Sequence, residues 1–532
     1  MQKEILINAG AGEIRVAVLE NGRLEELLLE RTIGRGEEGA RKRAGGLGSR
    51  SLVGNVYLGR VRRVLAGMQA AFVDIGLDRA GFLGAREARS LAGAAVADTP
   101  AAACANGARD LLSAHPTELG AEDRAPRIGD CVREGEDIVV QVVKDPIAEK
   151  GARLSANLSL PGRLLVLLPN QPGIALSRRI EDEAERLRLC EMCERMLRES
   201  EGALAPHAGF IVRSSAVGAE LADLRADAER LSDAWLAAME KREGAAAPQL
   251  LRRELDPVER IMRDECDADT TRVIVDDAEA LAAARAYCRR AMPEADNRIA
   301  RYDGPGLLFD LYEIEQEISA LLSPRVPLPS GGWITIEGTE GLTAIDVNSG
   351  SFTDGAGPEE TSFRVNLEAA AEIGRQLRLR GIGGLIVIDF IHTAEPAHSQ
   401  SVLEALALSL ARDRTPTQIL PMSEFGLVEV TRKRIRDPLA RQLTESCRPC
   451  TGRGRMPSCE TVALDILRGV EREARHAPGH PIFVRAAPEV VEWIESRGEE
   501  LRGELARRGV ARVSFEARDE FAREGFDVAV QG

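Results

Sequence analysis

Two short apolar segments of this chain each run into an aspartate, and this pattern constrains the fold more than any other feature. The segments are Leu-Thr-Ala-Ile-Asp-Val-Asn at 342–348 and Leu-Ile-Val-Ile-Asp-Phe at 385–390. Runs of β-branched residues preceded by glycine are typical of buried strands, and the stretch between the two segments has helical character. We therefore predict two neighbouring strands that bring Asp346 and Asp389 side by side.

The two strand-end carboxylates suit a hard divalent cation. An ionised carboxylate at the end of a buried strand is unfavourable unless a cation or another partner compensates it. Mg²⁺ binds oxygen ligands and is usually held by one or two carboxylates together with substrate phosphates. Asp346 and Asp389 are therefore candidate magnesium ligands. The alternative is that two ordinary strand-end aspartates cap the turns that follow, and the spacing alone leaves both interpretations open.

The composition limits the class of protein. At 532 residues, with 44% hydrophobic residues, the chain is long enough for several domains of about 150 residues each. Its net charge of −15 means that a polyanionic partner must meet local basic patches. The first residues lack the apolar core of a signal peptide, and no run approaches the ~18 apolar residues of a membrane span. Nine cysteines, an odd and scattered set, argue against a secreted disulfide framework. Together these features predict a soluble, cytoplasmic, multidomain protein.

Residues 50–145 carry short alternating strands with glycines at the corners, which predicts a small β-barrel interrupted by an Ala/Pro/Gly-rich loop at 90–127. The segments that begin at Gly54 and at Phe72 are similar to the S1 RNA-binding domain, a barrel of the OB-fold type. Phe72 and Phe82 would offer stacking faces to unpaired bases, and such stacking tolerates any base. The alternative is that both rings belong to the barrel core.

A C-x-x-C pair at Cys447 and Cys450 has the spacing of half a zinc site. Structural zinc takes four sulfur or nitrogen ligands, and the next candidates lie farther along the chain, at Cys459, His476 and His480. A half-site suggests that a second chain supplies the other two thiolates. The alternative is a redox pair, which would normally open a helix in a thioredoxin-like unit. The Gly and Arg residues after Cys450 argue against a helix start there, and the sequence shows no thioredoxin-like β-α-β context.

Basic residues gather in two places despite the acidic total. Arg375, Arg378 and Arg380 precede the second aspartate segment, and residues 431–436 with Arg441 precede the cysteine pair. A basic run is usually a solvated face. Near a pair of metal ligands it suits a phosphate track equally well.

Taken together, these segments resemble the ribonuclease E/G family over nearly the whole chain, apart from insertions at 34–50 and 90–127. The resemblance rests on the two aspartate segments, on Val-Lys-Asp-Pro at 143–146 and on the paired cysteines, which occur in the family's order. The chain is most like the ribonuclease G members. It ends soon after its small last domain and would lack the long disordered scaffold of ribonuclease E.

The resemblance implies a multidomain α/β (α+β) fold with ribonuclease H-like and deoxyribonuclease I-like parts, an inserted S1 (OB-fold) β-barrel, a zinc link and a small C-terminal α/β domain. The implied boundaries are 1–33 and 258–321 for the discontinuous ribonuclease H-like part, 50–145 for the S1 domain, 146–257 for a 5′-end sensor region, 322–443 for the deoxyribonuclease I-like catalytic domain, 444–457 for the zinc link and 458–532 for the small domain.

The resemblance also implies roles for single residues. Asp346 and Asp389 match the ligands of a catalytic Mg²⁺, and Asn348 matches a residue that supports Asp346 or the scissile phosphate. The implied RNA-gripping positions are Phe72, Phe82, Lys150 and, within the Val-Lys-Asp-Pro segment, Lys144.

Three further positions match a pocket for a 5′-monophosphate: Gly162, Arg213 and Ser214. The family usually has threonine where this chain has Ser214, and the hydroxyl is retained. The alternative for Arg213 is an ordinary strand-end arginine paired with a surface carboxylate. Cys447 and Cys450 match a zinc link between subunits, although the family's proline usually follows the first cysteine and here it is Pro449.

The activity that the resemblance implies is Mg²⁺-dependent, single-strand-specific endoribonuclease cleavage in rRNA processing and mRNA turnover. It implies a preference for 5′-monophosphorylated, A/U-rich RNA and products with a 5′-phosphate and a 3′-hydroxyl. The expected partners are rRNA precursors, mRNA and further copies of the chain in a homodimer or homotetramer. One alternative is a non-catalytic S1-domain RNA-binding protein, which would need neither aspartate. Another is a redox or zinc-assembly protein.

Overall fold

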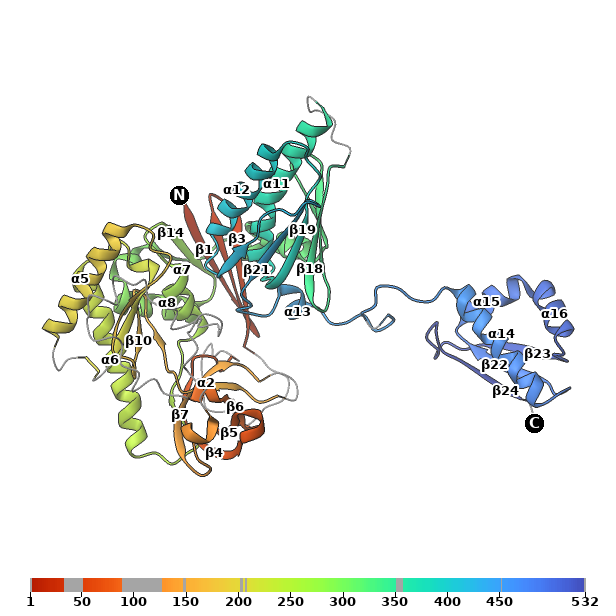
Figure 1. Ribbon diagram of the computed structural model, residues 1–532, viewed down its shortest axis with the longest axis horizontal. Helices are drawn as coiled ribbons and strands as arrows, with labels where there is room; N and C mark the ends of the chain where they lie inside the picture. Colours follow the sequence, from red (N-terminus) through yellow and green to blue (C-terminus); the bar gives the residue numbers. More distant parts are fainter. Residues whose placement is uncertain are drawn as a thin grey trace. The chain divides into compact units, whose positions relative to one another are not determined.

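The computed structural model describes residues 2–32, 51–88, 127–146, 150–200, 204–205, 208–350, 357–450 and 452–530. They belong to two compact units, unit 1 at residues 1–436 and unit 2 at residues 437–532 (Figure 1). The predicted insertion at 34–50 falls outside the described residues, and so does the predicted insertion at 90–127 except for its last residue. In the part of the chain that the structure describes, no helix is long and apolar enough to cross a membrane.

A five-stranded sheet in unit 1 joins the beginning of the chain to a segment more than 230 residues later. Its strands, in the order β15-β14-β1-β2-β3, are β1 (Lys3–Gly10), β2 (Glu13–Glu20), β3 (Arg23–Arg31), β14 (Thr270–Val275) and β15 (Ile299–Arg301). β1 runs parallel to β14 and antiparallel to β2. Alternate apolar residues such as Ile5, Val16 and Val273 pack with residues of α7 (Pro257–Glu265) and α8 (Ala278–Ala291) into one core.

The predicted barrel is confirmed as a closed five-stranded sheet. Its strands are β4 (Val56–Leu65), β5 (Ala70–Asp74), β6 (Gly81–Gly84), β8 (Arg153–Ser155) and β7 (Asp137–Lys144), and pairing of β4 with β7 closes the ring. β13 (Gln249–Arg252) adds to β4 from outside. Glycines permit the close approach of strands, since a Cβ at Gly59 would lie 2.6 Å from Val73 Cγ1 and one at Gly81 would lie 2.5 Å from Leu154 Cδ1.

A four-stranded sheet follows the barrel. Its strands, in the order β11-β12-β10-β9, are β9 (Leu160–Pro161), β10 (Leu165–Leu168), β11 (Gly173–Leu176) and β12 (Gly209–Val212). The helices α5 (Glu183–Glu199) and α6 (Leu221–Glu243) share its core, in which Leu165, Cys193, Phe210 and Trp235 are buried. This sheet carries the positions predicted to hold a 5′-phosphate.

The sheet that carries both aspartates has six strands. In the order β16-β17-β18-β19-β21-β20, they are β16 (Arg325–Pro327), β17 (Trp333–Gly338), β18 (Leu342–Asn348), β19 (Gly384–Asp389), β20 (Thr417–Ile419) and β21 (Leu427–Arg432). The helices α11 (Pro358–Leu379) and α12 (Pro396–Ala411) lie along one face of it (Figure 1). Ile345, Ile388 and Val428 are buried on that face, in the core that the helices share.

The prediction of a phosphate track at Arg375, Arg378 and Arg380 was wrong, because all three arginines are buried. Arg375 donates to the Leu24 carbonyl oxygen at 2.8 Å and pairs with two glutamates, and Arg378 pairs with Glu25 of β3. A buried cation needs such partners. Arg375 and Arg378 therefore tie α11 to the N-terminal sheet.

The second basic cluster, at residues 431–436 with Arg441, contains both buried and exposed side chains. Arg432 is buried and pairs with Asp413, whose Oδ2 lies 2.6 Å from Arg432 Nε, and Arg436 donates to the Leu27 carbonyl oxygen at 2.9 Å. Lys433 and Arg434 remain exposed. Arg441 is exposed as well, so Lys433, Arg434 and Arg441 can take part in a solvated or phosphate-facing surface.

Unit 2 is a small α/β domain. Its elements are α13 (Leu439–Leu443), α14 (Cys459–His476), β22 (Ile482–Ala486), α15 (Pro488–Ser496), α16 (Gly498–Arg507), β23 (Val513–Ala517) and β24 (Phe526–Val530), with strand order β23-β22-β24. β22 and β23 are parallel and joined by two helices, so the prediction that a β-α-β unit is absent was wrong. The unit forms because β22 pairs with β23 across the two helices that join them. The local sequence pattern does not show this pairing. Neither Cys447 nor Cys450 opens a helix in it.

Candidate functional site

The two predicted aspartates are direct neighbours across parallel strands. Asp346 of β18 pairs in register with Asp389 of β19, so that both side chains leave the same face of the sheet. That face lies opposite the helices, and both carboxylates are exposed. Phe390 is buried on the helix side, which fixes the alternation and turns Asp389 outward.

Two asparagines order this edge of the sheet. The Asn348 side chain donates from Nδ2 to Asp346 Oδ2 at 2.6 Å, as a supporting residue should. The buried Asn366 of α11 accepts from the Ile391 backbone N–H at 3.0 Å and donates to the Ile391 carbonyl oxygen at 2.7 Å. Asn366 thereby holds the backbone that follows Asp389. This role was not predicted, because an asparagine within an amphipathic helix gives no local signal in the sequence.

The carboxylate pair fits a divalent cation that is only partly enclosed by protein. Asp346 and Asp389 offer oxygen ligands on an open face, and the Asn348 amide orients one of them. Among the described residues, no group of three or more His, Cys, Asp or Glu side chains could enclose a metal ion. Mg²⁺ keeps several waters and is usually bound by one or two carboxylates plus substrate phosphates, which this arrangement matches.

Gly162 and Arg213 are brought together as predicted. Arg213, which directly follows β12, donates from Nη1 to the Gly162 carbonyl oxygen and from Nη2 to Asp264 Oδ1 at 2.8 Å. A Cβ at Gly162 would lie 2.6 Å from Asp227 Oδ2, so only glycine fits there. The Ser214 hydroxyl, next along the chain, has no hydrogen-bond partner among the described residues and is half-buried. Arg213 thus has a carboxylate partner, and Ser214 remains available.

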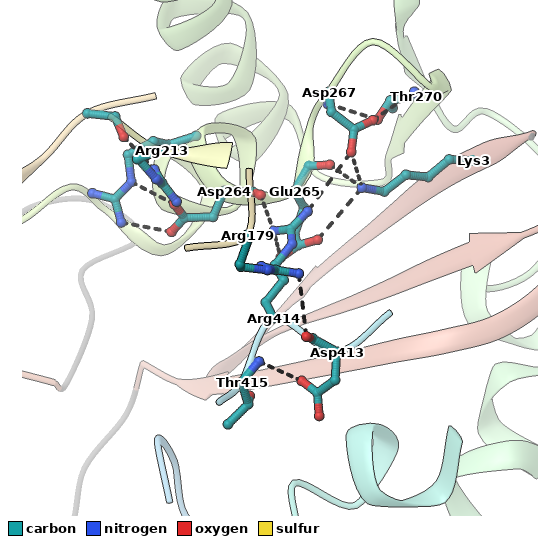
Figure 2. A network of polar contacts seen from close by, with 12 residues as sticks. Lys3, Arg179, Arg213, Asp264, Glu265, Asp267, Thr270, Asp413, Arg414 and Thr415 are labelled. Carbon is teal, nitrogen blue, oxygen red and sulfur yellow. Dashed lines mark hydrogen bonds and ion pairs between the residues drawn. The ribbon is translucent and has the colours of Figure 1, made fainter. Parts of the chain in front are cut away.

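A dense polar network continues from Arg213 (Figure 2). Arg414 donates to the Asp264 carbonyl oxygen and to Glu265 Oε1, the latter at 2.7 Å. Lys3 of β1 donates to the Glu265 carbonyl oxygen at 2.6 Å and to Asp267 Oδ2 at 2.7 Å. Three segments far apart in the sequence therefore meet at the end of α7.

Burial governs the carboxyl groups of this network. Burial raises the pKa of Glu265 to about 8, and the charge of Glu26 acts in the same direction, while Arg414 and Lys3 oppose the shift. Burial also raises the pKa of Asp264, but hydrogen bonds and charge from Arg263 and Arg213 outweigh it and leave that pKa below its usual value. Neighbouring carboxyl groups thus differ in their protonation.

The network reaches the sheet that carries the aspartates. Arg179 donates to the Asp413 carbonyl oxygen at 3.4 Å, and the Asp413 side chain accepts from Arg432 of β21. β21 pairs with β19, the strand of Asp389. Arg414 and Asp413 were not predicted from the sequence, since their partners lie far away along the chain.

On the barrel, Phe72 and Phe82 face each other across β5 and β6. Their ring centroids are 6.2 Å apart and their planes meet at 79°, and both rings are half-buried. The neighbours Ala71, Val73 and Leu83 fill the barrel core, so the two rings lie on its outer face. Lys144 and Lys150 are exposed.

The cysteine pair lies before the first long helix of unit 2. Cys447 is exposed and Cys450 is partly exposed. The backbone N–H of Gly454, the Cys447 side chain and the N–H of Gly452 lower the pKa of Cys450. Such a turn favours the thiolate form, which zinc requires. The two sulfurs are half of a tetrahedral set, and Cys459 begins α14 nine residues after Cys450.

Comparisons with known proteins agree with this architecture. The model of the ribonuclease E/G family matches residues 159–435, and the chain is 36% identical to ribonuclease G of Escherichia coli strain K12 over 530 residues, which is 100% of both chains. The chain belongs to the ribonuclease E/G family. It is also 36% identical to ribonuclease G of Haemophilus influenzae over 535 residues, 99% of each chain. It is 36% identical to ribonuclease E of E. coli K12 over 475 residues, which is 89% of this chain and 40% of that relative.

The family models cover most of the candidate residues. The ribonuclease E/G model includes both aspartates, Asn348 and the Arg213 pocket. A second model, described as the thioredoxin-like domain of RNase E/G, matches residues 446–530 and includes the cysteine pair and the β-α-β unit. The barrel lies outside both models and is covered by the full-length relatives.

Proposed function

We propose that this member of the ribonuclease E/G family is an endoribonuclease that hydrolyses single-stranded RNA at the Asp346–Asp389 edge. The observation that carries the proposal is the register of β18 and β19, which sets two exposed carboxylates side by side. The curated relatives are named as ribonuclease G and ribonuclease E. The expected substrates are rRNA precursors and mRNA in the cytoplasm, with a preference for 5′-monophosphorylated, A/U-rich strands.

Asp346 and Asp389 would hold Mg²⁺, and Asn348 would keep the Asp346 carboxylate in its binding orientation through the 2.6 Å hydrogen bond. Mg²⁺ held by these residues would supply Lewis-acid chemistry at the scissile phosphate and would help to activate the attacking water. Asn366 keeps the backbone after Asp389 fixed, so the carboxylate geometry is set before substrate arrives. Hydrolysis joins the water oxygen to phosphorus and breaks the P–O3′ bond, which leaves a 5′-phosphate and a 3′-hydroxyl.

Gly162, Arg213 and Ser214 would receive the 5′-monophosphate. An arginine guanidinium offers paired N–H donors that match a phosphate, and the Ser214 hydroxyl adds a further donor. The Asp264 partner already fixes the guanidinium, since the pair is 2.8 Å apart. Sensing in this pocket would therefore use an arginine that is oriented before the phosphate binds.

Phe72 and Phe82 would stack on bases of the strand, with Lys144 and Lys150 supplying charge for its phosphates. The outward, half-buried position of both rings supports this role. We further propose that the barrel is an S1 domain, that the sheet of β1–β3 with β14 and β15 is the ribonuclease H-like part, and that the sheet of Asp346 is the deoxyribonuclease I-like part. The four-stranded sheet would be the 5′-end sensor.

Cys447 and Cys450 would bind a structural zinc ion together with the same pair of a second chain. A tetrahedral site needs four ligands, and a twofold axis brings two identical pairs together. The lowered pKa of Cys450 supports metal binding rather than an inert thiol. This arrangement predicts a homodimer as the basic assembly, from which a tetramer can be built.

The deciding experiment is cleavage of a 5′-monophosphorylated, A/U-rich single-stranded RNA in Mg²⁺ and in EDTA. An endoribonuclease cuts the RNA only with the metal, and its Asp346→Asn variant binds the RNA without cutting it. A non-catalytic RNA-binding protein would bind the RNA equally in both conditions and leave it intact. That second result would remove the enzymatic proposal.

A further inference from the structure

The large apolar side chain with the greatest exposure in the described part of the chain is Phe425, at 86%. It lies in the connection between β20 and β21, next to the sheet edge that carries the aspartates. Covering an exposed aromatic ring with a partner is favourable, because apolar surface is removed from water. Aromatic residues are also few in this chain, at 4% of the sequence.

The backbone that carries Phe425 is a hydrogen-bonded turn. The Gly426 N–H donates to the Ser423 carbonyl oxygen at 3.0 Å, and the Ser423 N–H donates to the Leu427 carbonyl oxygen at 2.8 Å. The Leu427 N–H donates to Ser423 Oγ at 3.1 Å. Gly426 has a φ of +82°, which closes the turn and favours glycine. Phe425 is thus the third residue of a closed four-residue turn rather than part of a loose loop.

The turn lies beside the carboxylate pair. Leu427 pairs in register with Asp389, which pairs with Asp346, so the three side chains form one row across the open face of the sheet. A Cβ on Gly426 would lie 3.8 Å from the carbonyl oxygen of Phe390, the residue after Asp389. The residue adjoining Phe425 therefore lies close to the backbone that directly follows a proposed metal ligand.

We propose that Phe425 stacks on a nucleobase of the RNA strand next to the scissile phosphate. This inference rests on the proposed endoribonuclease function, because that function brings a single strand to this edge. Base stacking on an aromatic ring accepts any base, so Phe425 positions the strand without reading its sequence. Its contribution adds to the contacts that Phe72 and Phe82 make on the barrel.

A second copy of the chain is a less suitable occupant. A stable protein interface needs about 800 Å² from each partner, with a contiguous apolar centre. Phe425 is preceded by the exposed polar residues Ser423 and Glu424 and is followed by Gly426. A single ring in a polar turn offers too little area for an interface, but it matches the face of one base.

The test compares Phe425→Ala and Phe425→Tyr with Leu408→Ala. Leu408 is 72% exposed on α12, in the helix layer on the other side of the sheet. Single-turnover cleavage by Phe425→Ala should fall about 5- to 100-fold. Phe425→Tyr and Leu408→Ala should cleave like the parent chain. Cleavage by Phe425→Ala at the parent rate would overturn the proposal.

Substrates with one abasic position near the cleavage site identify the stacked base. In the parent chain, an abasic site at one such position should slow cleavage by the same factor as Phe425→Ala. Combining that abasic site with Phe425→Ala should slow cleavage no further than either change alone. Full additivity would overturn the proposal. Light scattering on the same variants tests whether a second copy of the chain covers the ring instead. A change from dimer to monomer in Phe425→Ala would assign the ring to a contact between chains.

RNA with 2-aminopurine at that position, bound to the Asp346→Asn variant, tests stacking without cleavage. Its fluorescence should be quenched by the parent ring and regained in the Phe425→Ala, Asp346→Asn double variant. This readout separates the two proposals. If the parent chain does not cleave RNA, the endoribonuclease function fails, and stacking is then supported or overturned by the fluorescence alone.

Discussion

The carboxylates at the sheet edge and the carboxylates of the Figure 2 network are held in opposite ways. Asp346 and Asp389 are exposed on an open face, where Asp346 accepts one hydrogen bond from Asn348. Asp264 and Glu265 lie in a network of arginine and lysine partners drawn from three segments (Figure 2). Buried charges need partners within the protein, whereas exposed carboxylates keep their oxygens available for a ligand. Availability for a ligand therefore distinguishes a site better than the number of charges.

The arginines of α11 extend this lesson to cations. Arg375 and Arg378 lie in a run that resembles a phosphate-binding cluster, but each is buried and paired with glutamates. Arg213 is intermediate between the exposed aspartates and the buried arginines, since it has the partner Asp264 and yet is only half-buried. Beside it lies the Ser214 hydroxyl, which has no partner in the described part of the chain. A cation of this kind can be fixed by one carboxylate and still meet a phosphate.

The largest expected effect is the loss of cleavage on removal of one exposed carboxylate. Asp346→Asn or Asp389→Asn should lower cleavage by about 10³-fold or more, because the metal's stabilisation of the transition state is worth several kcal/mol. RNA affinity should change little. The matched control is Glu337→Gln, an exposed carboxylate on β17 of the same sheet. Parent-like turnover by both aspartate variants at low Mg²⁺ would contradict the site.

The second prediction concerns zinc binding by the exposed cysteine pair. The Cys447→Ser, Cys450→Ser double variant should lose its zinc and move from dimer to monomer, because two thiolates of a four-ligand site are removed. Metal analysis with light scattering should give one zinc per two parent chains. Cys459→Ser serves as the control. One zinc per chain, or a metal-free dimer that survives the double substitution, would refute the shared site.

On the barrel, Phe72→Ala should weaken binding of single-stranded RNA by about 1–3 kcal/mol, since a half-buried outward ring is free to stack on a base. A fully buried ring would instead cost ~3–5 kcal/mol of stability. Met68→Ala, 63% exposed on the same barrel, is the control. Thermal melting and RNA affinity are measured on each variant. A large loss of stability with unchanged affinity of the folded chain would assign Phe72 to the core.

Arg213→Ala should lower the ratio of cleavage rates for 5′-monophosphate over 5′-hydroxyl RNA by about tenfold, the value of a charge-assisted hydrogen bond near 1.5 kcal/mol. Asp264 keeps Arg263 as a partner, so the fold should remain intact. Arg225→Ala removes an arginine paired with Glu199 elsewhere in this region and is the control. An unchanged ratio would leave Arg213 as a structural partner of Asp264 alone.

The last prediction concerns the pH dependence of stability rather than RNA cleavage or binding. The pKa of Glu265 is about 8 in the fold against 4.5 for an ordinary glutamate. Between these values the folded chain keeps a proton that the unfolded chain has lost, so stability should fall as the pH rises from 4.5 to 8 and then level off. Glu265→Gln should flatten that decline.

Melting temperature between pH 5 and 8 measures this effect, with about 2–4 °C expected for each kcal/mol. Glu424→Gln, which replaces an exposed glutamate in the turn of Phe425, is the control. A decline with pH that is as steep in Glu265→Gln as in the parent chain would assign it to another group.

The sequence predicted the features that depend on local pattern. Apolar runs that end in aspartate gave β18 and β19, and glycine-punctuated alternation gave the barrel. Each of these signals lies within about ten residues, the range over which backbone preference and side-chain alternation act. The family resemblance added an ordered set of such segments.

The tertiary structure alone decided which side chains are free. Arg378 can be buried because it pairs with Glu25, which lies 353 residues away in the sequence. Arg414 is fixed by the side chain of Glu265, which lies 149 residues earlier. Strand register put the turn of Phe425 at the edge where Asp346 and Asp389 lie side by side, as the sequence had predicted for these two residues. Local sequence determines which strands and helices can form, but the burial of a charge depends on partners from distant segments, and that depends on how the sheets pack.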